Sequence, residues 1–259
     1  DTSTTLFGER YRLPFGCAPT GFTRMMHAEG ERAVVRATGR AGIPYALSTM
    51  STTSIQDLQT EAPDAAKMFQ LYLWKDHDRS RELMALAQQN GYKALILTVD
   101  VPVTGNRMRD ARYGMAIPPQ LNLRTFLDAS YRPHWWFDFL TTEPLRFAFA
   151  HSESASLGEV MSRLVDPGAT IDDLAWMIEA WDGPVIVKGI QTVEDAVKVT
   201  AAGADGIILS NHGGRQLDRA PLPLRLVPQV RRELGDDATI MLDTGIMSGA
   251  DIVAAIAAG

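Results

Sequence analysis

The chain has 259 residues, of which 46% are hydrophobic and 22% charged, and its formal net charge is -6. This composition suffices for a sizeable core, most simply one large α/β domain. An acidic chain offers no basic face to a phosphate backbone, so we expect no nucleic-acid partner. The lone Cys17 excludes an intrachain disulfide and favours a reducing, cytoplasmic location. We also expect neither export nor a membrane span, because no apolar run approaches roughly 18 residues and no signal segment is recognisable.

Seven short apolar runs recur along the chain, each ending in polar residues or glycine. They cover 15–21, 45–52, 67–74, 94–101, 184–190, 205–213 and 239–246, and each is typical of a parallel strand buried on both faces. Segments with helical periodicity lie between several of these runs and end at glycine, at 29–42, 80–91, 192–203 and 224–235. This alternation predicts a (β/α)8 TIM barrel. A doubly wound open sheet is the alternative, although no G-x-G-x-x-G turn follows the first run.

We therefore predict one barrel domain over 1–259, with an insertion at about 103–172 that lies over the barrel mouth. An eighth strand should follow Gly259, and both ends of the chain look cut. The insertion should crowd six aromatic residues together, either against the barrel or a neighbouring subunit or in a membrane surface: Trp135, Trp136, Phe137, Phe139, Phe147 and Phe149. Charged neighbours exclude a spanning helix there.

Hydrogen-bonding residues stand at the end of every predicted strand. Alternate strand residues point to the same side, and a buried polar atom without a partner costs on the order of 1–3 kcal/mol. These residues therefore predict a polar ligand site at the carboxyl ends of the strands: Thr20, Ser48, Gln70, Tyr72, Thr98, Asp100, Lys188, Ser210, His212 and Asp243.

Lys188 ends an apolar strand, where an ammonium group needs an anionic partner. It could form a Schiff base in a barrel lyase, hold an electron-rich cofactor, or extend out of the strand end into solvent.

The segment SNHGGRQLD (210–218) places a histidine, two glycines and an arginine directly after a strand. Asp100 could fix the tautomer of His212, which suits a general base. Arg215 offers a planar fork to a carboxylate, so the pair suggests a 2-hydroxy or 2-oxo acid. The remaining histidines lack ligand spacing, and we expect no metal site.

Together with APTG (18–21), LST (47–49), FQLY (69–72), TVD (98–100), VKG (187–189) and DTG (243–245), this segment resembles the FMN-dependent L-2-hydroxy acid dehydrogenases and oxidases. The resemblance runs along the whole chain and implies a TIM barrel that binds FMN. Bacterial respiratory L-lactate dehydrogenases are the most similar members, and mandelate dehydrogenase is next.

The resemblance also implies roles. His212 would be the base, Asp100 would orient it, Arg215 and Arg107 would bind the substrate carboxylate, and Tyr72 would contact the substrate near its hydroxyl. Lys188 would stabilise reduced flavin. The remaining flavin contacts would be Pro19, Thr20, Ser48, Gln70, Thr98, Ser210, Asp243 and Gly245.

One departure concerns phosphate binding, because Met247 and Ser248 stand where many relatives carry arginine. The family's N-terminal tyrosine and final strand would lie beyond the two ends, so a non-catalytic flavin-binding fragment is an alternative. Electrons would pass to a quinone or cytochrome, with peripheral contact to the inner face of the cell membrane. Molecular oxygen is the alternative acceptor, (S)-mandelate the alternative substrate, and a homotetramer the expected assembly.

Overall fold

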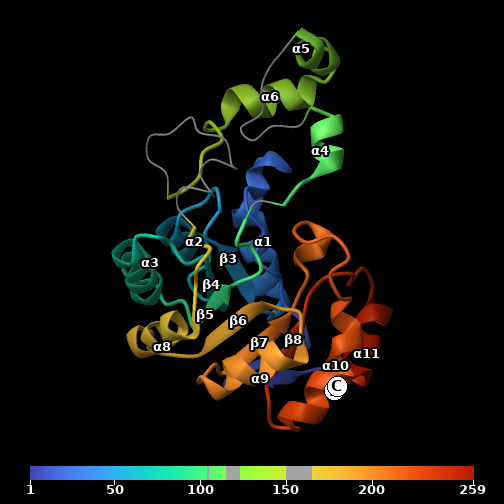
Figure 1. Ribbon diagram of the computed structural model, residues 1–259. Coiled ribbons are helices and arrows are strands. Elements are labelled where there is room, and N and C mark those ends of the chain that lie inside the picture. Colours follow the sequence, from blue (N-terminus) through green and yellow to red (C-terminus); the bar gives the residue numbers. More distant parts are fainter. Residues whose placement is uncertain (104, 115–122, 150–164) are drawn as a thin grey trace.

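The computed structural model describes residues 1–103, 105–114, 123–149 and 165–259 (Figure 1). Six parallel strands form one sheet in chain order: β3 (Tyr45–Ser48), β4 (Lys67–Leu71), β5 (Ala94–Thr98), β6 (Val185–Ile190), β7 (Gly206–Leu209) and β8 (Ile240–Leu242). Each strand pairs with its neighbour in sequence, so the described sheet lacks the order reversal of a doubly wound fold. The predicted TIM-barrel architecture is confirmed for these strands.

Helices follow the strands and surround the sheet (Figure 1): α1 (Gly30–Ala41), α2 (Ile55–Glu61), α3 (His77–Gln89), α8 (Ile171–Ala180), α9 (Val193–Ala201), α10 (Pro223–Leu234) and α11 (Gly249–Ala257). The four predicted helices are confirmed as α1, α3, α9 and α10. Helix α2 was not predicted, because seven residues are too few to establish a period. Ser54, its N-cap, accepts a hydrogen bond from the Asp57 amide and was the available signal.

The strands divide their residues between two cores by simple alternation. Outward residues such as Leu47, Phe69, Leu95, Val187 and Leu209 pack against the helices in the main core. Inward residues form a second apolar cluster, of Ala46, Met68, Ala94, Ile96, Ile186 and Ile208. Residues two positions further along five of these strands also face inward, and there the row is polar: Ser48, Gln70, Thr98, Lys188 and Ser210.

The predicted strand at 15–21 is only an isolated parallel bridge between Cys17 and Tyr45. The segment still lies beside β3, because the Cys17 carbonyl accepts from the Ala46 amide and the Phe22 amide donates to the Met50 carbonyl. Pro19 lacks the N–H that a longer ladder would need. The prediction is therefore wrong about a regular strand, although the segment takes the expected place.

An antiparallel hairpin of β1 (Thr4–Leu6) and β2 (Glu9–Tyr11) precedes this segment and was not predicted. Its two-residue turn has positive φ at both Phe7 and Gly8, as hairpin turns of this length favour. Leu6 and Phe7 then pack against the inward apolar cluster.

Beyond one end of the sheet stand α4 (Met108–Arg112), α5 (Leu123–Ala129) and α6 (Pro133–Thr141), which we call the projection (Figure 1). The six aromatic residues do not form one cluster. Trp135, Trp136 and Phe139 contact one another near Phe126, whereas Phe147 and Phe149 pack on Phe22 and Trp74. The second group joins the returning chain to the barrel. Among the described helices, none is long and apolar enough to cross a membrane.

Glu31 on α1 is fully buried and holds the loop after β3. Its carboxylate accepts from the Thr52 amide at 2.8 Å, the Thr52 hydroxyl at 2.6 Å and the Thr53 hydroxyl at 2.9 Å. Burial raises the pKa of Glu31, but hydrogen bonds, chiefly those from Thr52, outweigh it and leave that pKa below its ordinary value. The ionised carboxylate therefore stabilises the fold above the unfolded-state pKa, and this contribution is lost as pH falls through the lower folded-state value.

We predict that Glu31→Gln lowers the free energy of unfolding at pH 7 by about 1–3 kcal/mol. Chemical denaturation should show the difference from wild type shrinking as pH falls below about 4. Glu179→Gln, at an exposed position on α8, is the matched control and should change stability little at any pH. A Glu31→Gln difference that stayed constant from pH 7 to pH 3 would contradict the assignment.

Candidate active site

Side chains of the polar inward row bond to one another across neighbouring strands. The Gln70 amide accepts from the Ser48 hydroxyl at 3.1 Å and donates to the Thr98 hydroxyl at 3.0 Å. All three residues are buried. The amide is thus oriented by β3 and β5, and this part of the row is rigid.

Lys188 continues the row on β6 with its side chain only 4% exposed. Its ammonium donates to the Ser210 hydroxyl at 2.7 Å and forms an ion pair with Asp243 at 2.5 Å. The anionic partner that was predicted for Lys188 is therefore Asp243, just beyond β8. Extension of Lys188 into solvent is excluded by its burial.

His212 lies between a carboxylate and a phenol. Its Nδ1 is 2.9 Å from Oδ1 of Asp100, whose side chain is 1% exposed, and its Nε2 is 3.5 Å from the Tyr72 hydroxyl. Burial, and then the Asp100 charge, raise the pKa of Tyr72, while the Arg107 charge lowers it. Tyr72 therefore remains a neutral hydrogen-bond donor.

Two local features let His212 and Asp100 meet. Gly189 has φ +104°, and a Cβ there would stand 2.7 Å from both Cβ and Cγ of Asp100. His212 itself has φ +58°, an uncommon conformation for a residue other than glycine. Its amide donates to the Ser210 hydroxyl at 3.0 Å, which ties this backbone to the polar row. This role of Gly189 was not predicted, and its place directly after Lys188 was the available signal in the sequence.

Arg107 and Arg215 lie beside this pair, and the structure adds Asp110, which was not predicted. Nη2 of Arg215 is 3.5 Å from Oδ2 of Asp110 on α4. Burial, and then the Arg215 charge, lower the pKa of Arg107, whereas Asp110 and Tyr72 raise it. In the described part of the chain, Nε of Arg107 and Oδ2 of Asp100 are buried without a hydrogen-bond partner.

The other predicted flavin contacts lie at the periphery. Pro19 is half-buried and Thr20 exposed in the segment beside β3, and Gly245 is exposed with φ +78°. Ser248 caps α11 and bonds the Asp251 carboxylate at 2.8 Å, so its hydroxyl is engaged. A Cβ at Gly213, Gly214 or Gly245 would meet only open space.

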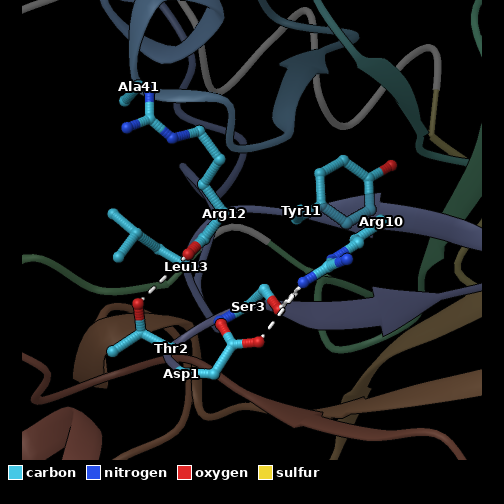
Figure 2. Close-up of a pocket in the computed structure, with 8 residues that line it drawn as sticks. All are labelled: Asp1, Thr2, Ser3, Arg10, Tyr11, Arg12, Leu13 and Ala41. Carbon is cyan, nitrogen blue, oxygen red and sulfur yellow. Dashed lines mark hydrogen bonds and ion pairs between the residues drawn. The ribbon is translucent and has the colours of Figure 1, made fainter.

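A cavity of about 650 Å³ lies elsewhere (Figure 2). It is bordered by the first residues of the chain, the hairpin and the end of α1, including Asp1, Arg10 and Arg12. None of the predicted site residues borders it. Among the described residues, no group of three or more histidine, cysteine or acidic side chains is arranged to hold a metal ion.

The family model of the FMN-dependent dehydrogenases matches residues 1–259. The chain belongs to this family. It is 56% identical over 254 residues to "Putative L-lactate dehydrogenase" of Mycobacterium tuberculosis, covering 98% of this chain and 61% of that protein. It is 38% identical to the L-lactate dehydrogenase of Caulobacter vibrioides, covering all of this chain and 69% of that protein. The chain thus spans less than two thirds of the Mycobacterium relative.

The fold agrees with the family assignment. A crystal structure of (S)-mandelate dehydrogenase, a monotopic membrane protein, superposes with a TM-score of 0.92 at 36% identity. The match covers 99% of this chain and 69% of that one. FMN is the cofactor of the family.

The Lys188–Asp243 ion pair generates a stability prediction. Asp243→Asn leaves a buried ammonium without its counter-charge, and we expect the free energy of unfolding to fall by about 3–5 kcal/mol. Urea denaturation measures the change. Asp237→Asn, at an exposed position just before β8, is the matched control and should lie within about 0.5 kcal/mol of wild type. A loss no larger than in the control would show that Lys188 does not depend on Asp243.

Proposed function

We propose that this chain is the barrel region of an FMN-dependent enzyme that oxidises L-lactate to pyruvate and passes the electrons to a quinone or cytochrome. The observation that carries the proposal is the contact of 2.9 Å between His212 and the buried Asp100, with Tyr72 on the other side of the imidazole. A general base, its orienting carboxylate and two arginines then face one substrate site.

The two arginines would bind the substrate carboxylate. A guanidinium group matches a carboxylate through two parallel hydrogen bonds. Arg215 is about half exposed and engages Asp110 through one nitrogen, which leaves other donors free. Arg107 has a buried Nε without a partner, and a carboxylate could accept from this N–H and from a neighbouring Nη at the same time. Tyr72 would donate its hydroxyl near the substrate oxygen.

His212 would take one of the two hydrogens of the substrate as a proton. Asp100 accepts the hydrogen on Nδ1, which leaves the lone pair of Nε2 free on the side of Tyr72. As the imidazole becomes charged, the buried carboxylate stabilises it. The oxidation removes the hydrogen on Cα and the hydrogen on the hydroxyl, in total two protons and two electrons.

The chain's residues suit the cofactor of its family. The polar inward row supplies amide, hydroxyl and ammonium groups that are oriented by hydrogen bonds to one another. The flavin ring carries several nitrogen and oxygen atoms, and these groups could bond to them. When bound, FMN supplies a two-electron acceptor. Lys188 would add positive charge beside the reduced ring. The other proposed contacts are Pro19, Thr20, Ser48, Gln70, Thr98, Ser210, Asp243 and Gly245.

Two alternatives are weaker. A Schiff-base lyase needs a free amine, whereas Lys188 is an ammonium held by Ser210 and Asp243. A non-catalytic fragment has no need to keep His212, Asp100 and Tyr72 in contact. (S)-Mandelate remains a second candidate substrate, because the structure of its dehydrogenase superposes over nearly the whole chain.

For the FMN-loaded full-length protein, we expect L-lactate to bleach the flavin anaerobically, faster than glycolate or (S)-mandelate. His212→Ala should slow the reduction by about 10²–10⁴-fold, because the proton acceptor is lost. Asp100→Asn should slow it by at least about tenfold, since the imidazole loses its orienting charge. Stopped-flow absorbance measures each rate, and reoxidation by a quinone or by oxygen identifies the acceptor.

His134→Ala, at an exposed position on α6, is the control and should react as wild type does. Full reduction by L-lactate in His212→Ala would overturn the assignment of the base. Protein that binds no flavin, or whose flavin L-lactate leaves oxidised, would overturn the proposed function.

The projection would contact the membrane surface. Phe137 and Leu140 on α6 are 67% and 74% exposed, and Leu123, Phe126 and Leu127 on α5 are also exposed. Such an apolar surface suits burial among lipid headgroups and acyl chains. A quinone acceptor dissolves in the same layer, which supports this placement on the inner face of the cell membrane. The tetramer stays a prediction.

Phe137→Ser with Leu140→Ser should lower binding to vesicles of phosphatidylethanolamine and phosphatidylglycerol by at least about tenfold, because burial of each side chain contributes about 1.5–3 kcal/mol. Vesicle flotation measures the bound fraction. Val197→Ser with Leu222→Ser, at exposed apolar positions on the barrel, is the matched control and should bind as wild type does. Equal losses in both double variants would argue against the projection as the binding surface.

A further inference from the structure

Asp110 contributes a negative charge to the site that the proposed reaction does not use. Its Oδ2 lies 3.5 Å from Nη2 of Arg215, and its side chain is 30% exposed. Its charge also acts on Arg107. Burial and the Arg215 charge lower the pKa of that guanidinium, and the Asp110 charge raises it. One carboxylate therefore faces both arginines.

The position of Asp110 is set by the chain that leaves β5. A Cβ at Gly105 would stand 2.1 Å from the Arg215 carbonyl oxygen, so the two backbones are in close contact. Gln216 donates from Nε2 to the Val103 carbonyl at 3.1 Å and holds the same junction. The helix that carries Asp110 thus begins at a point fixed against the loop of Arg215, and their ion pair follows from the fold.

We infer that Asp110 is a specificity-determining residue, which restricts the site of Arg107 and Arg215 to substrates with a single carboxylate. The inference rests on the proposed function, in which these two arginines bind the substrate carboxylate. Asp110 already neutralises one of the two positive charges. A first substrate carboxylate neutralises the other, and a second carboxylate would meet Asp110 without a free cation.

The other charges near the site do not alter this comparison. Asp100 lies behind the imidazole of His212, which pairs with it. Lys188 is paired with Asp243 in the polar row. A binding site can gain specificity when a charged side chain repels a competing ligand that carries an extra charge of the same sign. Removal of the Asp110 charge should therefore favour dianions over monoanions, whatever it does to overall affinity.

The test compares propanoate with malonate, which have the same number of carbons but one and two carboxylates. Isothermal titration calorimetry on the FMN-loaded full-length protein gives both dissociation constants at fixed ionic strength. In Asp110→Asn we expect the affinity for malonate relative to propanoate to rise by at least about tenfold over wild type. The rise should shrink in high salt, because part of the site is exposed.

Two controls separate charge from structure. Asp110→Glu keeps the charge and should leave the ratio within about twofold of wild type. Asp128→Asn removes an acidic residue of α5 whose ion-pair partner is Arg132, at 3.7 Å, and not Arg107 or Arg215. This variant should also leave the ratio unchanged. Asp110→Ser is a second neutral variant with the same expected rise, should Asp110→Asn fold poorly.

An unchanged ratio in folded Asp110→Asn or Asp110→Ser would overturn the inference, as would an equal rise in Asp128→Asn. Wild-type protein that binds neither anion would overturn it too. If wild type oxidises L-lactate while the ratio does not respond, only the inference fails. If the ratio responds but L-lactate is not oxidised, the proposed function fails and the charge restriction stands.

Discussion

The site depends on the requirement that polar atoms on the buried inner face of the sheet find partners. Gln70 joins β3 to β5, and Lys188 joins β6 to the residues that follow β7 and β8. Leaving any of these groups unpaired would cost more than most single contacts contribute. The same bonds therefore hold the carboxyl ends of the strands together and orient the groups that face a ligand. Stability and ligand geometry share one set of interactions.

The reactive side chains belong to residues that directly follow the strands, just beyond the polar row. Asp100 and His212 follow β5 and β7, which are separated by β6, and Asp100 lies against Gly189 of β6. Parallel strands place their carboxyl ends at one edge, so residues that are distant in sequence converge without any long loop of their own. The projection enters and leaves at the same edge. This arrangement brings Asp110, on an outer helix, to the arginines.

Much of this was predictable because buried parallel strands obey a two-residue period. Apolar runs that end in polar residues identified six of the strands, and the hydrogen-bonding residues at the ends of these runs identified the polar row. Asp100, at the end of the run 94–101, was predicted as the partner of His212. The contact of Asp110 with Arg215 was not predictable, since it depends on the path of an irregular segment. The separation of Phe147 and Phe149 from the tryptophans depends on the same path.

The absence of a Cβ atom at Gly189 is a requirement for the position of Asp100. The space left by its absent side chain is occupied by Asp100, so even one added methyl group would have to displace the carboxylate that orients His212. Such a change removes no charged or titratable group and creates no cavity. Its effect would fall on proton transfer as well as on the local backbone, because φ at Gly189 is +104° and the added atom would also stand 2.8 Å from the Asp100 amide nitrogen. A survey of variants that considered only chemically reactive side chains would overlook this position, although the placement of Asp100 against His212 depends on it.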